Sequence, residues 1–303
     1  AEDFGRAVAL GLWDYLRKSR ANGYVISLSG GADSAACAVL VGLAVQLAFA
    51  QLGPDGAKAR VPWQEQFAGA ADAKAAVRAL LACAYQPTEN SGTVTHDAAR
   101  TIADAVGAEF HVIDVDAQVK QYVASIERTV GRKLTWEHDD VSLQNIQARV
   151  RAPSVWLLAN LRGAVLITTS NRSEAAVGYA TMDGDTAGGL APLGGIDKSY
   201  LRRWLAHMET HGLHGVAPLA ALRAITAQAP TAELRPPAQA QTDEVDLMPY
   251  DLLEAIEDGA IRDKHEPLEV LQELQPRYPQ LTAAQLAIWI ERFFRLWCRN
   301  PWK

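Results

Sequence analysis

The stretch SGGADS, residues 29–34, stands between an apolar run, residues 24–28, and an alanine-rich helix former. Two adjacent glycines at the start of a helix let a ligand approach the backbone closely, and helix N-termini attract phosphate. The serine hydroxyls supply further hydrogen-bond donors. One alternative is a tight strand-to-helix turn in which Asp33 is only a favourable charge at the helix N-terminus.

Asp33 raises the question of why a carboxylate stands where phosphate would bind. Two anions repel each other unless a divalent cation such as Mg²⁺ lies between them. The stretch has neither the lysine of the G-x-x-x-x-G-K-[ST] loop nor the spacing of the G-x-G-x-x-G dinucleotide pattern. It therefore predicts a phosphate cradle of N–H and hydroxyl groups, with Asp33 as a magnesium ligand.

Four apolar runs predict the strands that must position this loop: residues 24–28, 80–86, 110–115 and 164–169. They alternate with helical patterns at 33–52, 94–106, 116–130 and 143–161, after a first amphipathic helix at 4–18. Apolar strands without period-2 polarity, separated by helices, indicate a doubly wound parallel sheet covered on both faces. Such α/β sheets bind ligands at the carboxyl ends of their strands.

The remaining segments suggest how the chain is organised. Residues 53–71 read as a surface insertion, and residues 183–197 as a glycine-rich loop. A polar, linker-like stretch begins near residue 235, and only helical patterns follow it. We therefore expect a core of residues 1–235 and a helical C-terminal extension, residues 236–303, packed on the same domain.

Composition excludes several function classes. The 303 residues carry a net charge of −6, which argues against a nucleic-acid partner bound by a broad basic face. The apolar run at 35–50 is shorter than the ~20 residues of a membrane span, so we expect a core helix and no membrane partner. The three cysteines form no C-x-x-C pair, which favours a reducing compartment, the cytoplasm.

The loop resembles the SGGxDS loop of the ATP pyrophosphatases, which cleave ATP between its α and β phosphates. Residues 166–204 resemble the central block of one member of that class, NAD synthetase. The segments 143–151 and 229–256 are similar to its substrate-binding helix and to its P-[ST]-A-[DE]-L region. The similarity spans most of residues 4–256 and lies nearest to the synthetase domain of the glutamine-dependent members.

The resemblance implies adenylation of the nicotinate carboxylate of deamido-NAD by ATP, followed by displacement of AMP by ammonia. It also implies Mg²⁺ held by Asp33 and Glu174, with Lys198 as a third catalytic residue. The implied ATP-binding residues are Ser27, Leu28, Ser29, Gly30, Gly31, Ala32, Asp33, Ser34, Thr169, Lys198 and Thr231. The implied deamido-NAD-binding residues are Asn145, Arg149, Glu174, Tyr179, Thr181 and Asp185.

Each of these assignments competes with an ordinary structural explanation. Glu174 alone would be read as a residue that caps its helix, and beside Asp33 it is better explained as a metal ligand. Lys198 would normally be a solvated surface lysine, but it can also neutralise charge on a triphosphate. Arg149 could pair with an anionic group of deamido-NAD or form a structural ion pair. A non-catalytic relative that only binds nucleotide is the alternative for the whole chain.

The chain departs from the family pattern at two places. Gly189 stands where many ammonia-dependent members have a second acidic residue. No glutaminase domain and no Lys/His-containing C-terminal tail are recognisable within the 303 residues. We therefore expect a piece of a longer protein whose glutaminase domain is missing from this chain. We also expect a homodimer or larger assembly with the helix that contains Asn145 and Arg149 near the subunit contact.

Two further clusters are explained without the site. His207, His211 and His214 have a spacing that a zinc site could use, but the HExxH glutamate and nearby cysteines are missing. The aromatic residues Trp289, Phe293 and Trp297 recur at helical spacing, and we interpret them as a packing or subunit-contact face. None of the three cysteines has the setting of a nucleophile, so the sequence predicts ammonium and not glutamine as the nitrogen source of this chain.

Overall fold

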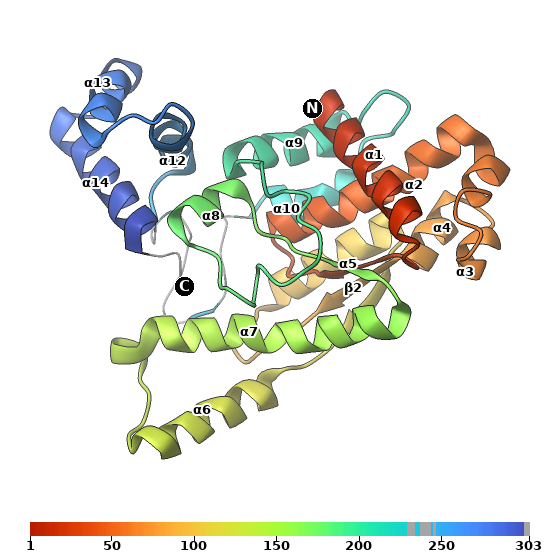
Figure 1. Cartoon of the computed structure of the whole chain (residues 1–303), viewed down its shortest axis with the longest axis horizontal. Helices are drawn as coiled ribbons and strands as arrows, with labels where there is room; N and C mark the ends of the chain where they lie inside the picture. Colours follow the sequence, from red (N-terminus) through yellow and green to blue (C-terminus); the bar gives the residue numbers. More distant parts are fainter. Residues whose placement is uncertain (229–233, 237–243, 245–246, 300–303) are drawn as a thin grey trace.

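A four-stranded parallel sheet forms the centre of the computed structural model, which describes residues 1–228, 234–236, 244 and 247–299 (Figure 1). The strand order is β3-β2-β1-β4, so β1 has a neighbour on each side. Tyr24 of β1 is in register with Leu81 of β2 and with Val165 of β4. The strands are β1 (Tyr24–Ser27), β2 (Leu81–Tyr85), β3 (Glu109–Val112) and β4 (Val165–Ile167).

The two faces of the sheet are covered by different helices, because successive strand residues point to opposite faces. Val25 and Leu166 pack against α7 (Trp136–Arg162). Ile26 and Cys83 belong to the main core with α1 (Glu2–Ser19), α2 (Ala32–Lys58) and α9 (Lys198–Thr210). The predicted doubly wound α/β fold is confirmed.

The long apolar helix α2 is the centre of the main core. Its side chains from Ser34 to Val45 are buried, and one window of it is apolar enough to cross a membrane by length and composition, with 67% of that window buried inside the protein. The expected core helix is therefore present. It extends beyond the predicted end at residue 52, with a non-helical Gly53 inside.

The segment 53–71 lies mostly at the surface, as expected, but a few apolar side chains anchor it to the core. Phe67, on the short helix α3 (Glu65–Ala68), is fully buried and packs against Trp13 and Phe49. The glycines, prolines and charges of this segment hid the few apolar residues that anchor it to the core. The predicted loop at 183–197 is confirmed as turns and bends, with Leu190 bridged to Ile167 of β4.

The other predicted helices lie within a few residues of their expected positions. Only α7 begins much earlier than predicted, at Trp136 instead of residue 143. The remaining helices are α4 (Ala73–Leu80), α5 (Thr93–Val106), α6 (Asp116–Val130), α8 (Arg172–Val177), η1 (Ala220–Leu222), α10 (Arg223–Thr226), α12 (Tyr250–Glu257), η2 (Asp258–Arg262), α13 (Pro267–Arg277) and α14 (Ala283–Arg299).

The C-terminal helices α12, α13 and α14 surround a hydrophobic cluster of their own, at one end of the molecule (Figure 1). Phe293 is fully buried there and Trp289 packs against the same cluster, as expected for a packing face, whereas Trp297 is 43% exposed. Val177 of α8 also belongs to this cluster. The C-terminal helices therefore pack against α8, the helix that follows β4. The boundary at residues 235 and 236 stays a prediction.

Candidate active site

The loop after β1 opens into a cavity of about 560 Å³ at the carboxyl end of the sheet. Gly31 is the N-cap of α2, and Gly31, Ala32 and Asp33 line the cavity, so the start of this helix faces it. Most of the predicted ATP-binding residues line the cavity: Ser27, Ser29, Gly30, Gly31, Ala32, Asp33, Ser34, Thr169 and Lys198.

Glycine is needed at position 30 for close packing within the protein, and not only for the expected approach of a ligand to the backbone. Its φ is 84°, and a Cβ atom here would lie 2.2 Å from the backbone oxygen of Thr95, at the start of α5. The glycine is therefore required by close packing against α5, in addition to any ligand. Gly31, with a φ of −92°, has an ordinary backbone conformation.

The two serines shape the loop. Ser34 Oγ accepts a hydrogen bond from the Ser29 N–H at 3.2 Å and lies 3.1 Å from Ser29 Oγ. Ser29 Oγ in turn accepts a bond from the Gly31 N–H at 3.3 Å. These bonds preorganise the loop before any ligand arrives.

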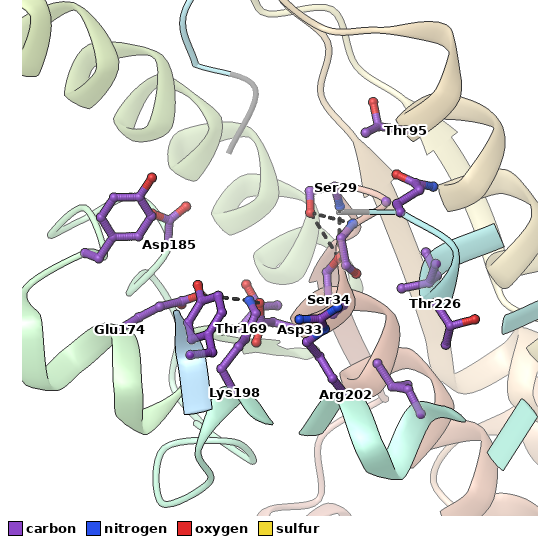
Figure 2. Close-up of a pocket in the computed structure, with 18 of the residues that line it drawn as sticks. Ser29, Asp33, Ser34, Thr95, Thr169, Glu174, Asp185, Lys198, Arg202 and Thr226 are labelled. Atoms are coloured by element: carbon purple, nitrogen blue, oxygen red, sulfur yellow. Dashed lines mark hydrogen bonds and ion pairs between the residues drawn. The ribbon is translucent and has the colours of Figure 1, made fainter. Parts of the chain in front are cut away.

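Asp33, Glu174 and Lys198 meet at this loop (Figure 2). Asp33 lies in the first turn of α2, Glu174 on α8, which follows β4, and Lys198 is the first residue of α9. The Lys198 Nζ atom contacts Asp33 Oδ2 and lies 2.9 Å from Glu174 Oε1. The Lys198 side chain is buried, so these charges interact with little screening by solvent.

Asn171 joins the Asp33 carboxylate to the backbone of Glu174 and was missed in the sequence. Its Nδ2 donates to Asp33 Oδ1 at 2.8 Å, and its Oδ1 accepts from the Glu174 N–H at 3.0 Å as the N-cap of α8. The signal was present, because Asn171 and Glu174 have the spacing of an N-cap residue and its N3 partner.

The carboxylate pair fits a magnesium ion. One cation, the Lys198 ammonium, already contacts both carboxylates, so the two groups are within reach of a single positive ion. Carboxylate oxygens are the ligands that Mg²⁺ prefers, usually together with substrate phosphates. Within the described residues no group of three or more His, Cys, Asp or Glu side chains could hold a metal, so the remaining ligands would come from substrate and water.

The predicted deamido-NAD residues divide into two groups. Glu174, Tyr179 and Asp185 line the cavity. Asn145, Arg149 and Thr181 are not among its lining residues. They hold the turn at 181–186 against α7, because Thr181 donates to Asn145 Oδ1 at 3.0 Å and Arg149 Nε donates to the Met182 carbonyl at 2.9 Å.

One predicted ATP-binding residue that the structure describes, Leu28, does not line the cavity. Leu28 is fully buried, and its N–H donates to the Ala84 carbonyl at 2.8 Å. This bond ties the residue before the glycine loop to β2. Thr231 lies outside the described residues.

Arg151 and Arg202 line the cavity although the sequence analysis did not single them out. Arg151 is two residues from Arg149 on α7, so it lies on the other side of the helix, facing the site. Arg202 is one turn beyond Lys198 on the same face of α9. Helical spacing from Lys198 could have identified Arg202. Only the rotation of α7 against the sheet distinguishes Arg151 from Arg149.

Helix α8 also contacts the C-terminal helices through Arg172. The Arg172 Nε atom lies 2.6 Å from Glu257 Oε1 on α12. Burial raises the pKa of Glu257, although the Arg172 guanidinium acts in the opposite direction. An ion pair therefore ties the helix that carries Glu174 to the C-terminal cluster.

The histidines and cysteines do not form further sites in the described part of the chain. The His207 and His211 rings stack with centroids 4.9 Å apart, and no metal-binding group is found there. Cys37 and Cys83 are completely buried, and burial raises the pKa of both thiols, whereas Cys298 is exposed. Buried thiols with raised pKa values are poor nucleophiles.

Comparisons with known proteins support one family. The family model for NAD synthase matches residues 5–292. The glutamine-dependent NAD(+) synthetase of Oryza sativa subsp. indica is 31% identical over 318 residues, which cover 96% of this chain and 42% of that protein. The chain thus spans less than half the length of this curated relative.

Solved structures agree. The crystal structure of a glutamine-dependent NAD(+) synthetase from Cytophaga hutchinsonii is 41% identical with a TM-score of 0.84, over 99% of this chain and 49% of that chain. The NH3-dependent NAD synthetase from Campylobacter jejuni covers 97% of this chain and 93% of its own, with a TM-score of 0.60. At 19% identity it is evidence for the fold alone.

The Gly30→Ala variant tests the loop geometry. We expect it to lose stability by more than about 1 kcal/mol, because alanine disfavours a positive φ and its Cβ would clash with Thr95. Gly131→Ala is the control, since its φ is 70° but open space surrounds it. Urea unfolding measures both. Equal losses in the two variants would contradict a role for the contact with α5.

Proposed function

The chain belongs to the NAD synthase family, and on this premise we propose that it amidates deamido-NAD to NAD with ammonia and ATP. The observation that carries the proposal is the convergence of Asp33, Glu174 and Lys198 beside the glycine loop in one cavity. A protein that only bound nucleotide would not need two carboxylates at a phosphate site. The reaction has two steps.

In the first step a carboxylate oxygen of the substrate attacks the α phosphate of ATP, and pyrophosphate leaves. The glycine loop and the N-terminus of α2 hold the phosphate chain. Asp33 and Glu174 would hold Mg²⁺, which neutralises the charge that develops on the phosphates. Lys198 supplies a further positive charge at the same place.

In the second step ammonia attacks the acyl carbon, and AMP leaves with the bonding electrons. The uncharged nucleophile loses a proton as the amide forms. Positioning and neutralised charge can supply much of the rate, so no dedicated base is required. Tyr179 and Asp185 line the part of the cavity where we place deamido-NAD.

We also propose a homodimer formed through α6 and α7. Helix α6 has no buried residue, and its side chains Tyr122, Ile126 and Val130 are at least half exposed. Leu157 and Leu161 of α7 are exposed as well. Five exposed apolar side chains on one pair of helices are typical of an interface, and a second copy of the chain would cover them.

We also propose that the protein is cytoplasmic, because its three cysteines are free thiols, as expected in a reducing compartment.

The carboxylates can be tested by Asp33→Asn and Glu174→Gln. We expect each variant to lower AMP formation at least about a hundredfold, the scale of losing one well-placed electrostatic group. Thermal unfolding should confirm that the fold persists. AMP release at the wild-type rate by either variant would remove that residue from the metal site.

The nitrogen source can be tested by mass spectrometry of the purified chain with deamido-NAD, ATP and Mg²⁺. We expect ¹⁵N from ammonium in the NAD formed and no ¹⁵N from amide-labelled glutamine, because no described cysteine has the setting of a nucleophile. The Asp33→Asn variant controls for contaminating enzymes. Failure to form NAD from any source would contradict the proposed function. Label from glutamine would contradict the assignment of the nitrogen source.

The interface can be tested by sedimentation. Ile126→Glu and Leu161→Glu should shift the chain from dimer to monomer, since each buries a charge in the proposed contact. Leu10→Glu, on an exposed position of α1, is the matched control and should stay dimeric. A wild-type chain that is active as a monomer would refute the dimer.

A further inference from the structure

The two carboxylate oxygens of Asp33 have different partners. Asp33 Oδ1 accepts from Asn171 Nδ2 at 2.8 Å, and Asp33 Oδ2 contacts the Lys198 ammonium. The same ammonium donates to Glu174 Oε1 at 2.9 Å. A lysine therefore lies between the two carboxylates (Figure 2).

This position conflicts with a metal at the same carboxylates. An ammonium between Asp33 and Glu174 takes the place that an ion bound by both would need. The two cations would also repel each other strongly, because Lys198 is only 3% exposed. Magnesium can bind both carboxylates only after the ammonium moves.

A bound phosphate chain would offer the Lys198 ammonium alternative hydrogen-bond acceptors. Asp33 lies in the first turn of α2, so a lysine that contacts it lies beside the helix N-terminus and the glycine loop. Phosphate oxygens at that loop would be new partners for the Lys198 ammonium. Lys198 need not become an unpaired buried charge, which would be strongly unfavourable.

Asn171 has no such reason to move. It is 1% exposed, and its side chain is held at both ends, by the Glu174 N–H and by Asp33 Oδ1. Its amide group can keep Asp33 oriented toward Glu174 whichever cation is present. It is a positioning residue.

We propose that the Lys198 ammonium bridges the Asp33 and Glu174 carboxylates when no nucleotide is bound, and moves to phosphate oxygens when ATP binds. Asn171 holds Asp33 beside Glu174 in both states. This inference rests on the proposed function. Because ATP removes the competitor, metal and nucleotide must bind cooperatively, each strengthening the other by the same factor. The protein would then hold little metal without nucleotide.

The experiment is Mn²⁺ binding by electron paramagnetic resonance, with and without α,β-methylene-ATP, which is not cleaved between its α and β phosphates. The wild-type chain should bind Mn²⁺ tightly only with the analogue. Lys198→Met should bind Mn²⁺ without the analogue at least about fivefold more tightly than the wild type, the lower end of ordinary coupling. The analogue should then strengthen Mn²⁺ binding less in this variant than in the wild type, because only the phosphate ligands remain to be gained.

Asn171→Ser should act in the opposite direction. Serine is also a good N-cap, so α8 should persist, but the donor to Asp33 is lost. We expect at least about fivefold weaker Mn²⁺ binding in the presence of the analogue, whereas Asp72→Ser, at the N-cap of the distant helix α4, should change nothing. Lys18→Met, on an exposed lysine, controls for the net charge in the lysine variant.

Each outcome decides the inference. It is overturned if Lys198→Met binds Mn²⁺ as weakly as the wild type without nucleotide, or if Asn171→Ser binds it as well as the wild type with the analogue. If Lys198→Met is unstable in thermal unfolding, Lys198→Gln replaces it. A wild-type chain that couples Mn²⁺ to the analogue but forms no NAD would contradict the proposed function and leave this inference intact.

Discussion

The pairing of β1 with β4 is the constraint on which the candidate site depends. Asp33 follows β1 and Glu174 follows β4, so parallel neighbours bring the two carboxylates to the same edge of the sheet. Two like charges in a partly buried site need a cation between them. Lys198 supplies it here, and removal of that lysine would leave buried charge uncompensated. The three side chains of the candidate site therefore also compensate one another's charge.

Much of this arrangement could be predicted from the sequence. The four strands are continuous apolar runs, and the loop at 29–34 carries its chemistry in its residue types, so both were placed correctly. The face of α7 that lines the cavity could not be predicted, because Arg149 and Arg151 differ only in the rotation of the helix, which depends on packing against the sheet. Phe67 was missed since the few apolar residues of its segment are separated by glycines, prolines and charges and give no periodic signal.

The C-terminal helices are connected to the carboxylate pair through α8. One end of this six-residue helix carries Asn171 and Glu174, and Val177 at its other end packs in the C-terminal cluster. The ion pair of Arg172 with Glu257 adds a second connection. A helix this short has little stability of its own, so its position depends on the packing around it. The described site is therefore a product of both hydrophobic clusters.

The position of the cations around the cavity follows from the layers of the fold. Arg151 comes from α7, which covers one face of the sheet, whereas Lys198 and Arg202 come from α9, which packs in the core on the other face. Side chains from both layers can meet only past the edge of the sheet, where the strands end. The carboxyl edge adds the N-terminus of α2, whose dipole also favours anions. A polyanion would therefore meet positive charge from three directions at the edge of the sheet where Asp33 and Glu174 lie.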